Sequence, residues 1–170
     1  RSCSFFGGFD NYLTGFEQNK DNFLRIFKVT PGSKWITHRP PTMGHSSPVD
    51  QKHIDSEFFL ALTGTQMYHY SYTFPLQVYN KIQYYKAKVS RENCIDNYFE
   101  KIYLPWINAQ SPEERSIIEQ AYHGVHEFKP EVRGECFTKP FEGSHPEAIE
   151  EDLKSLRERV NQEREQINNE

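Results

Sequence analysis

An alternation of aromatic and smaller residues over positions 67–74 constrains the fold of this chain more than any other feature. The segment reads Met-Tyr-His-Tyr-Ser-Tyr-Thr-Phe. Successive side chains of a strand point to opposite faces, so the four rings share one face. Such a face is buried in a core or used as a binding surface. Because aromatic residues make up 15% of the chain, we expect rings to supply much of the core.

Helix-start patterns surround this strand, and the capping residues are Ser47, Ser111 and Ser144. Pro follows the first two directly and fits the first helical position, while Glu stands three residues after the last two. The helix from Ser111 is expected to bury Ile117 and Ile118. Apolar residues one turn apart predict a further helix that begins at residue 90 and ends at Pro105.

Strands are predicted over 23–29 and 78–89 from their β-branched and aromatic residues, and a loop over 37–47 from its Pro and Gly residues. The first helix is expected to end at Gly64. Strands and helices do not alternate here as they do in a doubly wound sheet. The predicted fold class is therefore α+β, with a small antiparallel sheet, three packed helices and a charged C-terminal helix.

The C-terminal segment differs from the rest of the chain in composition. Its apolar residues follow the alternating spacing of a heptad, with Glu163 in place of one of them: Ile149, Leu153, Leu156, Val160 and Ile167. Either the helix lies along the domain surface, or it forms an arm. We expect a single α+β domain at residues 1–143 and a helical extension at 144–170 that projects or packs only by its first half. Its outer half would then bind a protein partner or form a weak homodimer, because Glu163 disfavours a tight symmetric pair.

Four side chains are the candidate catalytic residues: His38, His45, Asp50 and His53. Imidazole and carboxylate groups together act as general acids, general bases or metal ligands. Their spacing matches no zinc signature, so solvent-exposed loop and helix residues are the alternative interpretation. We predict no cofactor, and a divalent metal is the ion that this set could hold. A hydrolase acting on a phosphoester or nucleic-acid substrate would follow from it.

Two further groups of residues suit chemistry less well. His123 and His126 stand beside Glu127, but His near a helix end also complements the helix dipole. The three cysteines form no CxxC pattern and allow one disulfide or three free thiols. Among them, a small buried side chain is the alternative to a reactive Cys94. The compartment stays open, with a soluble chain expected in the cytoplasm or outside the cell.

Arg25 on a predicted strand, Gly44-His45-Ser46-Ser47 before a helix, and a following strand with Tyr68 and Tyr70 stand in a suggestive order. This order loosely resembles that of the mono-ADP-ribosyltransferases, which combine an early arginine, a Ser-Thr-Ser strand and a late glutamate. The resemblance implies a toxin or effector with that transferase activity. The chain departs from the family because it has neither the Ser-Thr-Ser nor a Glu-x-Glu sequence.

No P-loop, GxSxG or GxGxxG motif is present, and Gly7-Gly8 is interpreted as a flexible joint rather than a phosphate cradle. The net charge of −4 disfavours nucleic-acid binding, although lysines at 81, 86 and 88 follow the tyrosine-rich strand and keep it open. No apolar run suits a membrane span. The leading prediction is a protein-binding domain that uses the aromatic sheet surface and the heptad-like C-terminal helix.

Overall fold

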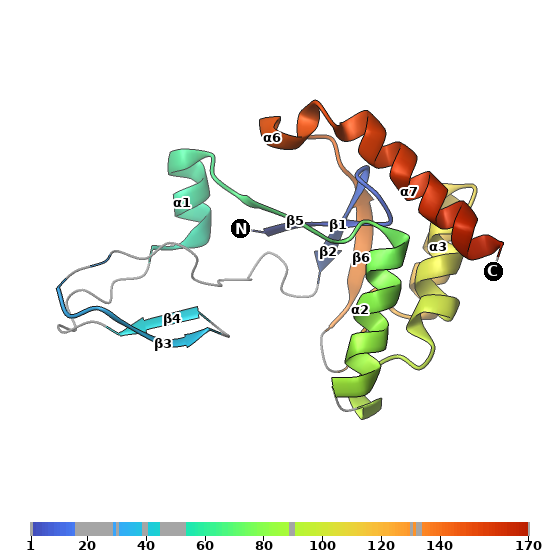
Figure 1. The fold of residues 1–170 in the computed structure, drawn as a ribbon, viewed down its shortest axis with the longest axis horizontal. Helices are drawn as coiled ribbons and strands as arrows, with labels where there is room; N and C mark the ends of the chain where they lie inside the picture. Colours follow the sequence, from blue (N-terminus) through green and yellow to red (C-terminus); the bar gives the residue numbers. More distant parts are fainter. Residues whose placement is uncertain are drawn as a thin grey trace. The chain divides into compact units, whose positions relative to one another are not determined.

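The computed structural model describes residues 2–15, 29, 31–38, 41–44, 54–88, 91–129, 131 and 134–169. The chain divides into two units. Residues 20–66, with residue 1, form the insertion unit, and residues 2–19 and 67–170 form the main unit. Figure 1 shows the helices and strands of both units.

In the insertion unit, strand β3 (Lys34–His38) pairs antiparallel with β4 (Pro41–Gly44). The loop predicted over 37–47 is therefore wrong where these strands lie. Helix α1 (Ser56–Thr63) begins after Asp55, whose carboxylate accepts the N–H groups of Glu57 and Phe58 at 3.0 Å.

Gly64 ends α1 in a left-handed conformation, with φ of 67°, as predicted. The predicted helix start at Ser47 lies outside the described residues. The strand predicted over 23–29 also lies outside them, apart from Val29, which belongs to no strand.

The main unit contains a four-stranded sheet in the order β5-β1-β2-β6. Its strands are β1 (Ser2–Phe6), β2 (Asn11–Gly15), β5 (Met67–Tyr72) and β6 (Cys136–Pro140). The α+β class and the strand over the aromatic alternation are confirmed. The sheet is mixed rather than antiparallel, because β1 and β5 pair in parallel. Parallel strands need a long connection between them, and the insertion between β2 and β5 supplies that length.

Helices accompany this sheet in the main unit (Figure 1). They are α2 (Pro75–Lys88), the short η3 (Arg91–Asn93), the π-helix η4 (Phe99–Tyr103), α3 (Leu104–Asn108), α4 (Pro112–Ala121), α6 (Glu147–Glu150) and α7 (Leu153–Asn168). The strand predicted over 78–89 is wrong, because residues 78–88 belong to α2. Pro75 begins that helix, and Val78 and Ile82 are buried one turn apart.

Three local features of the helices test the predictions. The helix predicted to end at Pro105 continues, because Pro105 lies in the first turn of α3, where a missing N–H group is tolerated. Ser111 caps α4 as predicted, with its Oγ 3.2 Å from the N of Glu114. The predicted burial of Ile117 is wrong, since its side chain is 66% exposed.

Aromatic rings lie on both faces of the sheet. The prediction that the rings of residues 67–74 share one face is wrong, because Tyr70 packs on Phe5 whereas Tyr72 packs on Phe6, past an irregularity in the β1–β5 pairing. Phe5 stacks on Tyr70 at a ring-centroid distance of 4.8 Å, and Phe141 and His145 pack against Phe5 at 4.9 and 4.8 Å. Tyr70 Oη lies 3.0 Å from His145 Nδ1, and His145 Nε2 lies 3.0 Å from Phe9 O. This part of the aromatic face therefore belongs to the core.

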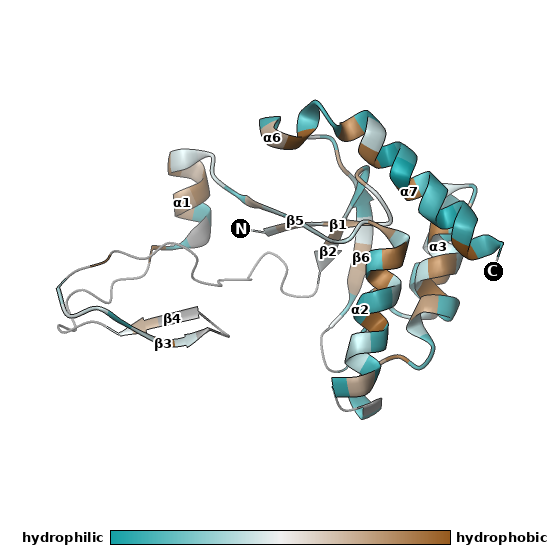
Figure 2. Ribbon diagram, in the orientation of Figure 1, coloured by the Kyte–Doolittle hydropathy of each residue, from teal (hydrophilic) through white to brown (hydrophobic). Residues whose placement is uncertain are grey.

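Helix α7 lies along the main unit, although its ribbon is mostly hydrophilic (Figure 2). Leu153 and Val160 are buried in a cluster with Phe9, and Ile167, near its end, packs against the larger core cluster. The prediction that its outer half projects is wrong, and the alternative of a helix along the domain surface is confirmed. The division into a domain at 1–143 and an extension at 144–170 stays a prediction.

Glu163 stands at an inward position of α7 because it caps another helix. Its Oε2 accepts the N–H of Leu76, in the first turn of α2, at 3.0 Å, and Arg159 Nε donates to its Oε1 at 2.8 Å. The cap predicted at Ser144 is wrong, since α6 begins after Pro146.

Candidate functional site: a paired acidic cluster and an arginine pocket

The predicted catalytic residues receive no test from the structure. His45, Asp50 and His53 lie outside the described residues, and His38 ends β3 with only its backbone described. Within the described ranges, no group of three or more His, Cys, Asp or Glu side chains is arranged to hold a metal ion. The cysteines at 3, 94 and 136 form no disulfide with one another.

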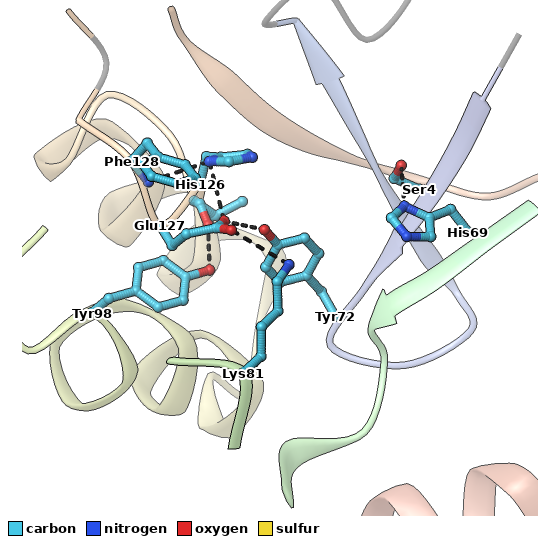
Figure 3. Close-up of polar contacts among 9 residues, drawn as sticks. Ser4, His69, Tyr72, Lys81, Tyr98, His126, Glu127 and Phe128 are labelled. Atoms are coloured by element: carbon cyan, nitrogen blue, oxygen red, sulfur yellow. Dashed lines mark hydrogen bonds and ion pairs between the residues drawn. The ribbon is translucent and has the colours of Figure 1, made fainter. Parts of the chain in front are cut away.

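His123 and His126 do not share a helical face, because α4 ends at Ala121. His123 lies in the turn that follows, with a positive φ of 54° and an exposed side chain. His126 points instead toward Glu127, in a buried group of polar side chains (Figure 3). We call Tyr72, Lys81, His126 and Glu127 the Glu127 cluster.

Three side chains meet the Glu127 carboxylate, which is only 4% exposed (Figure 3). Tyr72 donates a hydrogen bond to Oε2. Lys81 Nζ lies 3.4 Å from Oε1 and also 3.5 Å from the centre of the Tyr72 ring. His126 Nδ1 lies 3.1 Å from Oε2. Both carboxylate oxygens therefore have partners of suitable charge or hydrogen-bonding capacity.

The electrostatics of this cluster follow from its burial. Burial raises the pKa of Glu127, but the charges of His126 and Lys81 and the hydrogen bond from Tyr72 lower it, and the net pKa is below its ordinary value. Burial lowers the pKa of Lys81, an effect that Glu127 opposes. Burial raises the pKa of Tyr72 well above its ordinary value, and the Glu127 charge adds to that rise. The cluster thus holds a charged carboxylate and a neutral tyrosine.

The cavity beside the Glu127 cluster is too small for a substrate. Its volume is about 20 Å³, and its lining includes Cys94, Tyr98 and Glu127, so it has room for about one water molecule. Burial raises the pKa of the Cys94 thiol, which disfavours the nucleophilic thiolate. We interpret the Glu127 cluster as a structural element. A separate polar contact in Figure 3 joins strands β1 and β5, where Ser4 Oγ lies 3.4 Å from His69 Nδ1.

A larger pocket of about 240 Å³ lies elsewhere in the main unit. We call it the arginine pocket, and its lining residues are Gly7, Gly8, Phe9, Asp10, Asn11, Ile107, Arg115, Arg157, Val160, Asn161 and Arg164. They come from the β1–β2 turn, the end of α3, α4 and α7. Three arginines stand against one acidic residue in this lining, although the whole chain has a net charge of −4.

Each arginine of the pocket is positioned by a different neighbour. The guanidinium carbon of Arg115 lies 4.6 Å from the centre of the Trp106 ring. Arg164 Nη1 donates to Ile107 O at 3.3 Å. Arg157 Nη2 donates to Asp10 Oδ1 at 2.5 Å. Among the described residues, the Nε of Arg115 is buried and has no hydrogen-bond partner.

Trp106, which supports Arg115, is itself fixed in place. Its Nε1–H donates to the buried carboxylate of Glu119 at 2.8 Å, and Glu119 also accepts the N–H of Thr138 at 3.1 Å. A Cβ at position 7 would come within 2.3 Å of the Trp106 ring, and Gly7 has a φ of 64°. Glycine at this position therefore lets the β1–β2 turn close over the indole. The interpretation of Gly7-Gly8 as only a joint missed this role.

The sequence carries a partial signal of the arginine pocket. Arg157, Asn161 and Arg164 are spaced by four and three residues, so they share one face of α7. Arg115 lies on another helix, and Asp10 lies in the β1–β2 turn, far from α7 in the sequence. Only the tertiary fold brings these residues together.

Comparison with protein-family models, with curated proteins and with solved structures found no match for the chain. Within the described segments, every helix is too short or too polar to cross a membrane.

Proposed function

We propose that the chain binds a small anionic ligand in the arginine pocket. The observation that carries this proposal is the lining of the pocket, in which three arginines stand with one acidic residue. Guanidinium groups are charged donors, and those in excess of the carboxylates can bind the oxygens of an anion.

The chemistry of the arginines supports the same ligand class. A guanidinium group is always charged and presents a planar fork of donors that matches a carboxylate or a phosphate. Arg115 and Arg164 form no ion pair with a described acidic residue. Asp10, the acidic residue of the lining, is bound to Arg157. Two charges are therefore left for an anion.

Preorganisation also favours binding. Arg115 rests on a tryptophan that Glu119 fixes, and Arg164 is held by the carbonyl of Ile107. Side chains that are ordered before binding lose less conformational entropy when the ligand arrives. The volume of about 240 Å³ suits a small metabolite rather than a macromolecule.

Thermal unfolding with added anions tests this proposal. Inorganic phosphate should raise the melting temperature of the protein more than chloride at equal ionic strength, because a ligand that binds only the folded state stabilises it. Arg164→Gln should abolish the difference. Lys154→Gln removes the same charge from an exposed position of α7 outside the pocket lining, and should keep it. An equal response to both salts would contradict the proposal.

Protein binding is a second candidate, and exposed apolar side chains of the insertion unit favour it. Ile54, Phe58 and Leu62 are all exposed and follow one another at four-residue spacing in and before α1. Sedimentation velocity over a range of concentrations tests the simplest case, a weak homodimer. Phe58→Ser should reduce self-association without loss of folding, and sedimentation as a monomer at every concentration would exclude this case.

The other predicted functions rest on residues that the structure does not describe. The His/Asp-dependent hydrolase requires His45, Asp50 and His53, and the mono-ADP-ribosyltransferase resemblance requires Arg25. Both stay predictions. Protein binding through residues 144–170, most of which the structure describes, also stays a prediction.

A further inference from the structure

We infer that the ligand is a phosphate monoester of a hydroxyl-bearing compound, of the sugar phosphate class. This inference rests on the proposed function and names the chemistry of its ligand. The charges are distributed unevenly between the two ends of the arginine pocket.

The two ends are separated along α7. Arg157 and Arg164 are seven residues apart, which corresponds to about 10 Å along the helix axis at 1.5 Å per residue. Arg157 contacts Asp10 in the β1–β2 turn, whereas Arg164 contacts the carbonyl of Ile107 at the end of α3. The arginines of α7 therefore mark different ends of the pocket.

One end is cationic. Arg115 lies over Trp106, the neighbour of Ile107 in the chain, so it belongs to the same end as Arg164. The acidic residue of the lining, Asp10, is held at the other end by Arg157. Two guanidinium groups without a bound carboxylate match the charge and the several acceptor oxygens of a phosphate monoester dianion.

The other end is polar with little net charge. The Asp10 carboxylate is paired with Arg157, and Asn11, the next residue in the chain, lines the pocket with it. Amide groups both donate and accept hydrogen bonds, and a carboxylate accepts them, so this set matches hydroxyl groups, which do both. The pairing with Arg157 also weakens repulsion between Asp10 and a phosphate at the far end.

The pocket has space for the carbon skeleton between these ends. Its volume of about 240 Å³ leaves room beyond a phosphate group. Phe9 and Val160, both buried, form part of the wall and offer apolar contact. A ligand with a phosphate and several hydroxyl groups would therefore use the cationic end, the wall and the polar end at once.

Isothermal titration calorimetry tests this ligand class. The probes are inorganic phosphate, glucose, and three phosphate monoesters: glycerol 3-phosphate, ribose 5-phosphate and glucose 6-phosphate. At least one monoester should bind about tenfold more tightly than phosphate, the gain expected from about two net hydrogen bonds to hydroxyl groups. Glucose alone should show no heat of binding.

Variants separate the two ends. Asn11→Ala, next to Asp10 in the chain, should remove the advantage of the monoester and weaken the binding of phosphate less than that of the monoester. Arg164→Gln should weaken binding of both, and Lys154→Gln should change neither. Thermal melts of each variant check that it is folded.

The possible failures are distinct. If phosphate binds and no monoester binds more tightly, the inference is wrong and the proposed anion site stands. If Asn11→Ala weakens phosphate as much as the monoester, the assignment of the two ends is wrong. If neither phosphate nor any monoester binds, both proposals fall.

Discussion

The Glu127 cluster and the arginine pocket both hold charged side chains within the main unit, but they differ in how those charges are paired. In the cluster, one buried carboxylate contacts a lysine, a histidine and a tyrosine, beside a cavity of about 20 Å³. In the pocket, three arginines line a cavity of about 240 Å³ with one carboxylate, Asp10, which is bound to Arg157. Charge that is balanced within the protein serves its stability, whereas unbalanced charge beside a cavity is available for a ligand.

The largest predicted effect comes from breaking the balanced region. Glu127→Ala removes the common partner of Lys81, His126 and Tyr72, so it should lower the free energy of unfolding by about 3–5 kcal/mol. Urea denaturation measures this loss. Glu135→Ala, which removes the same charge from an exposed side chain, is the control and should cost less than about 1 kcal/mol. Equal losses in the two variants would contradict a structural role for the cluster.

Acid should remove part of the same stabilisation. The pKa of Glu127 is lower in the folded protein than its ordinary value of 4.5. Its contribution is therefore fully present above about pH 4.5 and is lost as the pH falls through the folded-state pKa. Urea titrations between pH 7 and pH 3 should show a smaller decline for Glu127→Gln than for the natural sequence. Parallel declines would show that Glu127 is not the responsible group.

A smaller effect is predicted for Glu163, which is buried like Glu127 but has partners that are more exposed. Glu163→Ala leaves the Leu76 N–H at the start of α2 without its acceptor, and should cost about 1–2 kcal/mol. Glu165→Ala changes the same charge at an exposed position of the same helix. A neutral result for Glu163→Ala in thermal unfolding would mean that water replaces the cap.

The smallest effect on stability is predicted for the pocket. The Arg157–Asp10 pair is 46% and 65% exposed, so Arg157→Ala should change the free energy of unfolding by only about 0–1 kcal/mol. If this variant were as damaging as Glu127→Ala in urea denaturation, the distinction between a stabilising cluster and a binding pocket would fail.

The features predicted correctly from the sequence depend on residues close together in the chain. Ser111 caps α4 through a contact three residues away, and Gly64 ends α1 through its own backbone conformation. The strand at 67–72 follows from alternation within one segment. In each case the residues that cause the feature lie within one short segment of the sequence.

The features that were missed depend on tertiary contacts. Tyrosines at 79, 84 and 85 favoured a strand, but burial of Val78 and Ile82 one turn apart favours α2. Glu163 interrupts an apolar series because it caps a helix that begins 88 residues earlier. The arginine pocket combines a turn and three helices, and no single segment holds enough of it to be recognised.

The most direct test of the central claim is NMR observation of the arginine Nε–Hε groups during a titration with inorganic phosphate. Signals are assigned from Arg→Lys variants. The signals of Arg115 and Arg164 should shift most, and at the same phosphate concentrations, because both guanidinium groups belong to the cationic part of the pocket lining. Arg159, which is bound to Glu163, should not move. An unchanged Arg115 signal at saturating phosphate, or equal shifts of all arginines, would contradict the claim.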